Sequence, residues 1–296
     1  MLPDPAPHRS GTVALVGRAN AGKSTLLNAL VGVQLAAVSD KPQTTRTRVL
    51  GVVTVPGMQA TLVDTPGLHR PRSELNRRMV AVAEKSLDEV DLVCWVVDAT
   101  RPLDEELRER LAGRRVVVAL NKVDLVADKT QLLPLIAGYA GAGDVVPVSA
   151  LRRDGLQALL SVWKPFLPEG EAVYPEDQAT PSSERSIVVE LVREQVVRNT
   201  GQELPYVTAV EIEQFNEARR EEGYVVIHAR IVVEKPSQKA MVIGAKGRSV
   251  KRIGTQARKR IEQLLGCKVD LRLFVAVEPD WTVSPRALSD FGYTGD

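Results

Sequence analysis

A glycine-rich segment near the N-terminus could bind phosphate groups. It fits the pattern G-x-x-x-x-G-K-[ST], with Gly17, Gly22, Lys23 and Ser24 at the fixed positions. An apolar run precedes it and a helical spacing follows it, as a phosphate-binding loop requires. Backbone N–H groups of such a loop, together with the helix N-terminus, favour anions. We expect nucleotide contacts from Asn20, Ala21, Gly22, Lys23, Ser24 and Thr25. Lys23 should contact the β- and γ-phosphates, and the Ser24 hydroxyl should bind Mg²⁺. The alternative, a glycine-rich turn with a surface lysine, fits this context poorly.

A second motif selects the base. Asn121, Lys122 and Asp124 stand in the order Asn-Lys-x-Asp directly after an apolar run that predicts a strand. The Asp124 carboxylate can accept hydrogen bonds from N1–H and the exocyclic amine of guanine. Adenine has neither donor and would leave that carboxylate unpaired, which is costly in a buried site. The pattern therefore predicts GTP and GDP as ligands, with Ser149 and Ala150 placed where a backbone N–H meets guanine O6.

Two polar loops are candidates for switches that respond to the γ-phosphate. Asp64 ends a predicted strand and should bind Mg²⁺ through a water molecule, while the Gly67 N–H should sense the γ-phosphate. In the segment 39–46, one threonine should complete the Mg²⁺ coordination, and we favour Thr45 over Thr44. Such loops are ordered by γ-phosphate and released on hydrolysis. Lys23, Thr45 and Gly67 are thus the catalytic candidates.

The expected reaction is in-line attack of water on the γ-phosphate, assisted by positioning and electrostatics. Ras-type enzymes orient that water with a glutamine after the switch glycine, but Leu68 stands at this position here. We therefore expect slow intrinsic turnover. Asn20 is either a ligand of a monovalent cation such as K⁺, which would supply positive charge, or a residue that only stabilises the loop.

A third motif points to RNA. Gly244, Ala245, Lys246 and Gly247 join a short apolar element to a predicted helix over 249–265. Eight basic residues and no acidic one occur from Lys239 to Ile261, which favours a polyanion site over an ordinary solvated face. A G-x-x-G loop between helices is typical of a KH domain, where it clamps about four single-stranded nucleotides. We expect RNA contacts from Gly244, Ala245, Lys246, Gly247, Arg248 and Lys251.

The elements that must carry these motifs fall into two sets. Up to about residue 163, apolar strands alternate with helices, which predicts an α/β GTPase domain with a mostly parallel sheet covered on both faces. From residue 184 the order is helix, strand, strand, helix, helix, strand, with the first strand expected at 206–215, which predicts an α+β KH domain. We expect a GTP-binding domain at 1–170, a proline-rich linker at 171–183, the KH domain at 184–280 and a tail at 281–296.

The composition of the chain indicates the cellular compartment in which it acts. The chain has 296 residues, 44% of them hydrophobic, and a net charge of +2. Cys94 lies in an apolar run and Cys267 at a predicted helix end, so neither predicts a disulfide or a zinc site. The first residues lack an apolar signal segment, and no apolar run approaches about 18 residues. We expect a cytoplasmic protein.

Taken together, these motifs resemble the Era family of GTPases over almost the whole chain. The resemblance extends to the segments 42–46, 64–69, 174–177, 203–206, 253–258 and 264–269. Family members usually carry proline where Ala19 stands and valine where Ala21 stands. The resemblance implies a monomer that binds 16S ribosomal RNA near its 3′ end, acts in assembly of the 30S subunit and associates peripherally with the inner membrane.

Two other functions compete with this one. In the first, the chain is a GTPase switch that acts on protein or membrane partners and uses the C-terminal domain for docking. In the second, it is a constitutive RNA-binding protein whose nucleotide is structural. The one-sided basic helix argues against the first, and the switch-loop candidates argue against the second.

Overall fold

The computed structural model describes residues 7–39, 46, 48–65, 74–201 and 204–293. Contacts divide the chain into two compact units. One consists of Met1–Val33, Arg48–Arg70 and Val82–Pro181, and the other of Gln34–Thr47, Pro71–Ala81 and Ser182–Asp296. No helix among the described residues is long and apolar enough to cross a membrane.

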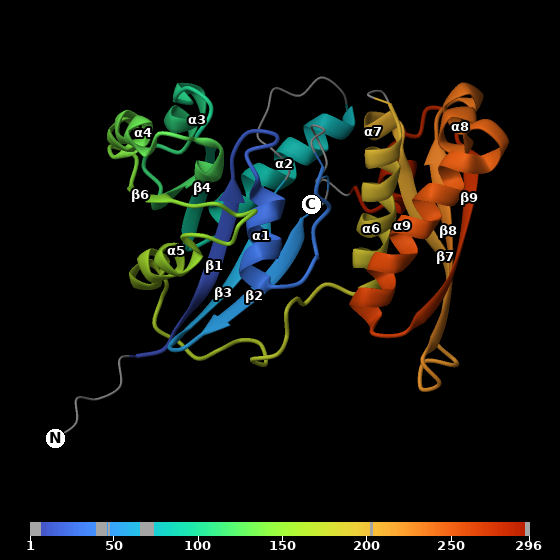
Figure 1. Ribbon diagram of the computed structural model, residues 1–296, viewed down its shortest axis with the longest axis horizontal. Helices are drawn as coiled ribbons and strands as arrows, with labels where there is room; N and C mark the ends of the chain where they lie inside the picture. Colours follow the sequence, from blue (N-terminus) through green and yellow to red (C-terminus); the bar gives the residue numbers. More distant parts are fainter. Residues whose placement is uncertain (1–6, 40–45, 47, 66–73, 202–203, 294–296) are drawn as a thin grey trace. The chain divides into compact units, whose positions relative to one another are not determined.

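The first unit contains a six-stranded sheet with strand order β2-β3-β1-β4-β5-β6 (Figure 1). The strands are β1 (Arg9–Val16), β2 (Val49–Val55), β3 (Met58–Asp64), β4 (Leu92–Asp98), β5 (Val116–Asn121) and β6 (Asp144–Pro147). Strands β2 and β3 form an antiparallel hairpin, and every other neighbouring pair is parallel. The mostly parallel sheet and the hairpin are confirmed.

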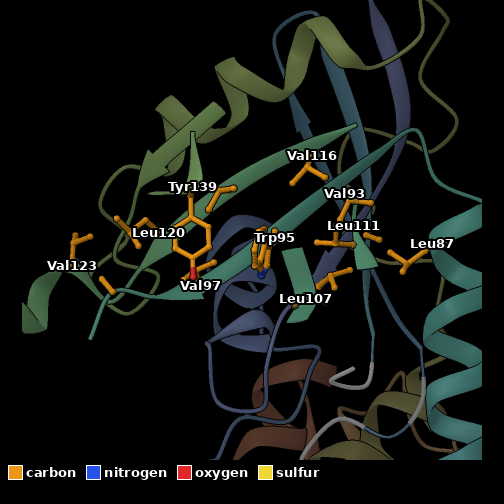
Figure 2. Close-up of a cluster of buried hydrophobic side chains, with 14 of the residues drawn as sticks. Leu87, Val93, Trp95, Val97, Leu107, Leu111, Val116, Leu120, Val123 and Tyr139 are labelled. Carbon is orange, nitrogen blue, oxygen red and sulfur yellow. The ribbon is translucent and has the colours of Figure 1, made fainter. Parts of the chain in front are cut away.

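Helices cover both faces of this sheet. They are α1 (Lys23–Val31), the part of α2 (Glu74–Asp88) that follows Ala81, α3 (Glu105–Arg110), α4 (Leu132–Tyr139) and α5 (Leu156–Trp163). Helix α1 contacts β1, β2 and β3, and α5 contacts β5 and β6. On the other face, side chains of α2, α3 and α4 pack around Trp95 and its neighbours (Figure 2). Because both faces are buried, the central strands are continuously apolar rather than alternating.

Cys94 belongs to this core. Its side chain is fully buried in β4, and burial raises the pKa of the thiol. The interpretation of Cys94 as a small core residue is confirmed.

The proline-rich segment that follows α5 is tied to the first unit. The buried amide of Gln59 accepts hydrogen bonds from the N–H groups of Val173 and Tyr174 at 2.7 and 2.9 Å, and donates to the Tyr174 carbonyl at 2.8 Å. Further on, the Val52 N–H donates to the Ala179 carbonyl at 2.8 Å. Its composition predicts a linker, and its described residues are held against the β2–β3 hairpin by these bonds.

The second unit contains a three-stranded sheet, order β7-β8-β9, in which β7 and β8 are antiparallel and β8 and β9 parallel. Its elements are α6 (Glu184–Asn199), α7 (Leu204–Val207), β7 (Ala209–Asn216), β8 (Tyr224–Val233), α8 (Pro236–Ile243), α9 (Arg248–Leu265), β9 (Lys268–Val277) and α10 (Pro285–Asp290). The predicted KH order of elements is confirmed.

One boundary was wrong. The strand expected at 206–215 begins only at Ala209, because 204–207 form the helical turn α7. The Thr208 hydroxyl donates to the carbonyl of Leu204, the first residue of this turn, at 2.8 Å. Apolar residues alone do not distinguish a short buried helix from a strand.

Candidate functional site

The phosphate-binding loop lies between the end of β1 at Val16 and the start of α1 at Lys23. Gly22, which precedes the helix, has φ of 100°, a left-handed value that favours glycine. A Cβ at Gly22 would lie 2.2 Å from Nδ2 of Asn121, and one at Gly17 would lie 2.3 Å from the Val96 carbonyl oxygen. Both fixed glycines therefore permit a close approach that no other residue could make.

The side chain of Lys23 is turned into the loop. It is 7% exposed, and its Nζ donates to the carbonyls of Gly17 and Arg18 at 3.0 and 3.1 Å. Burial lowers the pKa of the ammonium group, and the nearby Asp64 opposes that shift. A surface lysine is thus excluded, and the ammonium group lies within the loop.

The first helical turn and the end of β3 meet next to this lysine. The Ser24 hydroxyl donates to Oδ2 of Asp64 at 2.5 Å, and Asp64 is fully buried. Two oxygen ligands suited to a hard cation are therefore adjacent although they are 40 positions apart in the sequence. Thr45 and Gly67, the other predicted switch residues, lie outside the described residues, as do Thr44 and Leu68.

The side chain of Asn121, at the end of β5, links three segments by hydrogen bonds. Its Nδ2 donates to the Ala21 carbonyl at 2.9 Å, and its Oδ1 accepts from the Ala150 N–H at 3.0 Å. One side chain thus fixes the distance between the phosphate loop, the Asn-Lys-x-Asp segment and the Ser149–Ala150 segment. The predicted phosphate and base ends of the site are brought together.

The predicted base end contains a carboxylate that accepts a hydrogen bond from a serine. Oδ1 of Asp124 accepts from the Ser149 hydroxyl at 2.6 Å, while Oδ2 lies 3.9 Å from Nε of Arg152. The Asp124 side chain is 7% exposed and Ser149 is fully buried. An ionised carboxylate keeps acceptor capacity beyond these contacts, which is what recognition of guanine requires.

Lys122 has an acidic partner that the motif did not reveal. Its Nζ donates to Oδ2 of Asp98 at 2.7 Å. Burial alone would raise the pKa of the Asp98 carboxyl, but hydrogen bonds from Lys122 and Thr100 outweigh it and hold the pKa below its usual range. Asp98 is the last residue of β4 and lies opposite Asn121 of β5. An acidic residue at the end of a neighbouring predicted strand was therefore the sequence feature that could have identified this partner of Lys122.

In the second unit, the predicted RNA loop has an unusual backbone. Gly244, Lys246 and Gly247 all have positive φ, at 69°, 52° and 73°. A Cβ at Gly244 would lie 2.6 Å from Cβ of Ser249, whereas one at Gly247 would meet nothing within 4 Å. Glycine at position 244 therefore permits close packing against Ser249. Glycine at position 247 permits the left-handed backbone conformation, and the space beside it is open.

A groove begins at Val250, three residues after this loop. It has a volume of about 290 Å³ and lies between α9 and β9. Its lining consists of Val250, Lys251, Gly254, Thr255, Arg258, Leu271 and Leu273. Lys251 thus contributes charge beside an apolar wall, an arrangement that suits unstacked bases and their phosphates.

Not every basic residue of α9 faces the groove. Arg260 lies 3.3 Å from the buried carboxylate of Glu194 on α6, and Arg252 donates to the Asn199 carbonyl at 3.5 Å. The helix therefore divides its charge between the groove and the contact with α6, which the charge count alone could not show.

Comparisons with known proteins agree with both units. Residues 12–122 match a family model described as a 50S ribosome-binding GTPase, and residues 203–282 match a KH domain. The chain is 47% identical to GTPase Era of Geotalea uraniireducens over 293 residues, covering 96% of this chain and 98% of that protein. It is also 47% identical to GTPase Era of Xanthomonas campestris pv. campestris, covering 99% and 100%.

Two crystal structures superpose over almost the whole chain. One is a single-substitution variant of Aquifex aeolicus Era bound to GDP·AlF4⁻, and the other is Era in complex with MgGDPNP and nucleotides 1506–1542 of 16S ribosomal RNA. Each has a TM-score of 0.91 at 38% identity and covers 97% of this chain and 99% of its own.

A phosphate loop with a guanine motif on a mostly parallel sheet, followed by a KH domain, defines a GTPase of the RNA-binding class. Such enzymes hydrolyse GTP to GDP and phosphate. The chain belongs to the Era family of GTPases.

Proposed function

We propose that this GTPase binds single-stranded 16S ribosomal RNA near its 3′ end through the KH unit and acts in assembly of the 30S subunit. The loop 244–247 supports this most strongly, because its backbone has positive φ at three positions and the helix that follows it lines a groove with both basic and apolar residues. A related Era structure holds nucleotides 1506–1542 of 16S ribosomal RNA. RNA contacts are assigned to Gly244, Ala245, Lys246, Gly247, Arg248 and Lys251.

The nucleotide site has a role for each predicted residue. Asn20 to Thr25 bind the phosphates, with Lys23 directed to the β- and γ-phosphates. Asn121, Lys122, Asp124, Ser149 and Ala150 bind guanine. Mg²⁺ is the metal cofactor, since the Ser24 hydroxyl and the Asp64 carboxylate lie together at the loop. Thr45 and Gly67 complete the metal and γ-phosphate contacts.

Hydrolysis proceeds by attack of water on the γ-phosphate with GDP as the leaving group. Bound Mg²⁺ neutralises charge on phosphate oxygens. The protein's part is to hold the phosphates within the loop and to direct the Lys23 ammonium at the charge that develops on the β–γ bridge. We also propose that Asn20 binds K⁺, which adds positive charge at the same place.

The remaining assignments rest on the family. They are a monomeric state, a cytoplasmic location and a peripheral association with the inner membrane. None of them is needed for the chemistry of either site.

The test is RNA binding by the full chain in its GDP-bound and GTP-analogue-bound states. Fluorescence anisotropy would compare a labelled RNA with the 3′-end sequence of 16S ribosomal RNA and a scrambled RNA of equal length and composition. We expect at least tenfold tighter binding of the first in one nucleotide state. Equal affinity for both RNAs in both states would contradict sequence recognition, and no binding of either would favour a GTPase that acts on protein partners.

A further inference from the structure

The outer side of the phosphate loop is not packed against the core. It borders a cavity of about 340 Å³, whose lining includes the core residues Trp95, Val97 and Tyr139. On the other side of this cavity lies the segment 101–104, which leads into α3. A loop backed by a cavity lacks the close packing that holds most backbone segments in one conformation.

Residues 18–21 of the loop form a tight turn. The Ala21 N–H donates to the Arg18 carbonyl at 3.2 Å, and Asn20, the third residue, has φ of 65°. Ala19, the second residue, is not among those with positive φ. This is the pattern of a type II turn, which favours asparagine or glycine third and proline second. Alanine in the second position leaves the turn less restricted than proline would.

An ion pair spans the cavity from the first residue of this turn. Nε and Nη2 of Arg18 donate to Oδ2 and Oδ1 of Asp104 at 2.6 and 2.7 Å. This two-bond geometry is the strong form of an arginine–carboxylate pair. The hydrogen bond with Asp104 raises the pKa of the Arg18 guanidinium.

Asp104 is itself fixed in place. It is 8% exposed, and its Oδ1 accepts from the Leu107 N–H at 3.3 Å as the N-cap of α3. Its own N–H donates to the Tyr139 hydroxyl at 2.9 Å. The Tyr139 ring meets Trp95 edge to face, with centroids 4.9 Å apart, in the core shown in Figure 2. The carboxylate is therefore attached to a rigid part of the unit.

We propose that Asp104 is a positioning residue for nucleotide binding, acting through Arg18. The turn is tied at both ends, because Asp104 holds Arg18 and Asn121 holds the Ala21 carbonyl. Held in this way, the loop keeps its N–H groups directed at the phosphates before the nucleotide arrives. Less ordering is then required on binding, which increases affinity.

Two single substitutions test this. Asp104→Asn removes the charge but retains an N-cap side chain for α3, since asparagine caps as well as aspartate. Arg18→Gln leaves Asp104 in place and changes a side chain that is 65% exposed. We expect each to weaken GDP and GTP by the same factor, about three- to tenfold, mainly through faster dissociation. The turnover rate at saturating GTP should change less than twofold.

The double substitution and a rescue separate positioning from stability. If the two residues act as one pair, the double variant should bind GDP within about twofold of the weaker single variant. Adding Ala19→Pro to Asp104→Asn should recover at least half of the lost affinity on a logarithmic scale, because proline restricts the turn by another route. A merely structural role of Asp104 in α3 would lower the thermal unfolding midpoint without such a rescue.

Stopped-flow measurements with a fluorescent GDP analogue give these values, and the unsubstituted chain provides the reference for nucleotide binding. An effect of Asp104→Asn without one of Arg18→Gln would overturn the proposal. So would additive losses in the double variant, a rescue that fails, or weaker binding in the Ala19→Pro variant alone. Failure of the unsubstituted chain to bind GDP would instead count against the nucleotide site as a whole.

Discussion

Gly247→Asp provides the sharpest test of the RNA loop. The substitution places a carboxylate on the loop, in open space where phosphate of the RNA backbone should approach. Loss of one charge-assisted contact costs about 1.5–3 kcal/mol, equivalent to about a tenfold to 150-fold loss of affinity. Repulsion between carboxylate and phosphate adds to this. We expect RNA affinity to fall at least tenfold.

The chain offers a matched control in Gly223, on the turn between β7 and β8. Its φ is 76°, against 73° at Gly247, and a Cβ at either position meets nothing within 4 Å. Gly223→Asp therefore has the same change in net charge and similar backbone strain, and aspartate tolerates the left-handed region better than most residues. The difference in affinity between the two variants reports the location of the charge.

The assay is anisotropy of a labelled single-stranded RNA at about 0.15 M salt, where the Debye length is about 8 Å and distant charges are screened. The control should lose less than about threefold. GDP affinity should be unchanged in both variants, since that site belongs to the other unit. If Gly223→Asp weakens RNA binding as much as Gly247→Asp does, the attraction is diffuse and the assignment of the loop is wrong.

Three further predictions concern the nucleotide site. Asp124→Asn should weaken GTP and favour xanthosine nucleotides, because the new amide presents a donor where guanine requires an acceptor; unchanged GTP affinity in competition binding would refute this role. If Asn20 binds K⁺, GTP hydrolysis should be faster in potassium than in sodium at equal ionic strength, and Asn20→Ala should abolish the difference; equal rates for the unsubstituted chain would exclude the cation. The pKa of Asp98 is lowered by its partners despite burial, so its stabilising effect is present above its ordinary pKa and is lost as pH falls through the lowered one. Asp98→Asn should therefore lower the stability of the nucleotide-free protein by about 0.5–1 kcal/mol at pH 7, and a difference in unfolding midpoint that persists at acid pH would contradict this.

Features that depend on local chemistry could be predicted from the sequence. Both loops have glycine at the positions that their motifs require. A Cβ at Gly22 or at Gly244 would collide with a neighbouring side chain. The alternation of strands and helices likewise predicts the parallel sheet that brings the ends of β1, β3 and β5 together. Each predicted nucleotide-site residue that the structure describes ends a strand of this sheet or follows one.

Contacts between side chains that are far apart in the sequence could not be predicted in this way. Arg18 and Asp104 are 86 positions apart, and nothing around Asp104 marks it as a partner of the phosphate loop. The start of α3 is held by the hydrogen bond from the Asp104 N–H to the hydroxyl of Tyr139, whose ring packs against Trp95. Motifs locate groups that act on the ligand, but they do not reveal the residues that hold those groups in position.

The burial of Arg46 could not be predicted from the sequence either. Arg46 lies in a segment that its residues predict to be a polar loop, yet it is 2% exposed and belongs to the second unit. Its Nη1 donates to the Thr208 carbonyl at 2.8 Å and to the Tyr293 hydroxyl at 3.3 Å, from residues 162 and 247 positions away. Nε and Nη2 are buried without a hydrogen-bond partner among the described residues, and burial lowers the pKa of the guanidinium. A buried, partly satisfied cation costs free energy that packing elsewhere in the unit must offset, so its position is decided by tertiary contacts and not by the polar pattern around it.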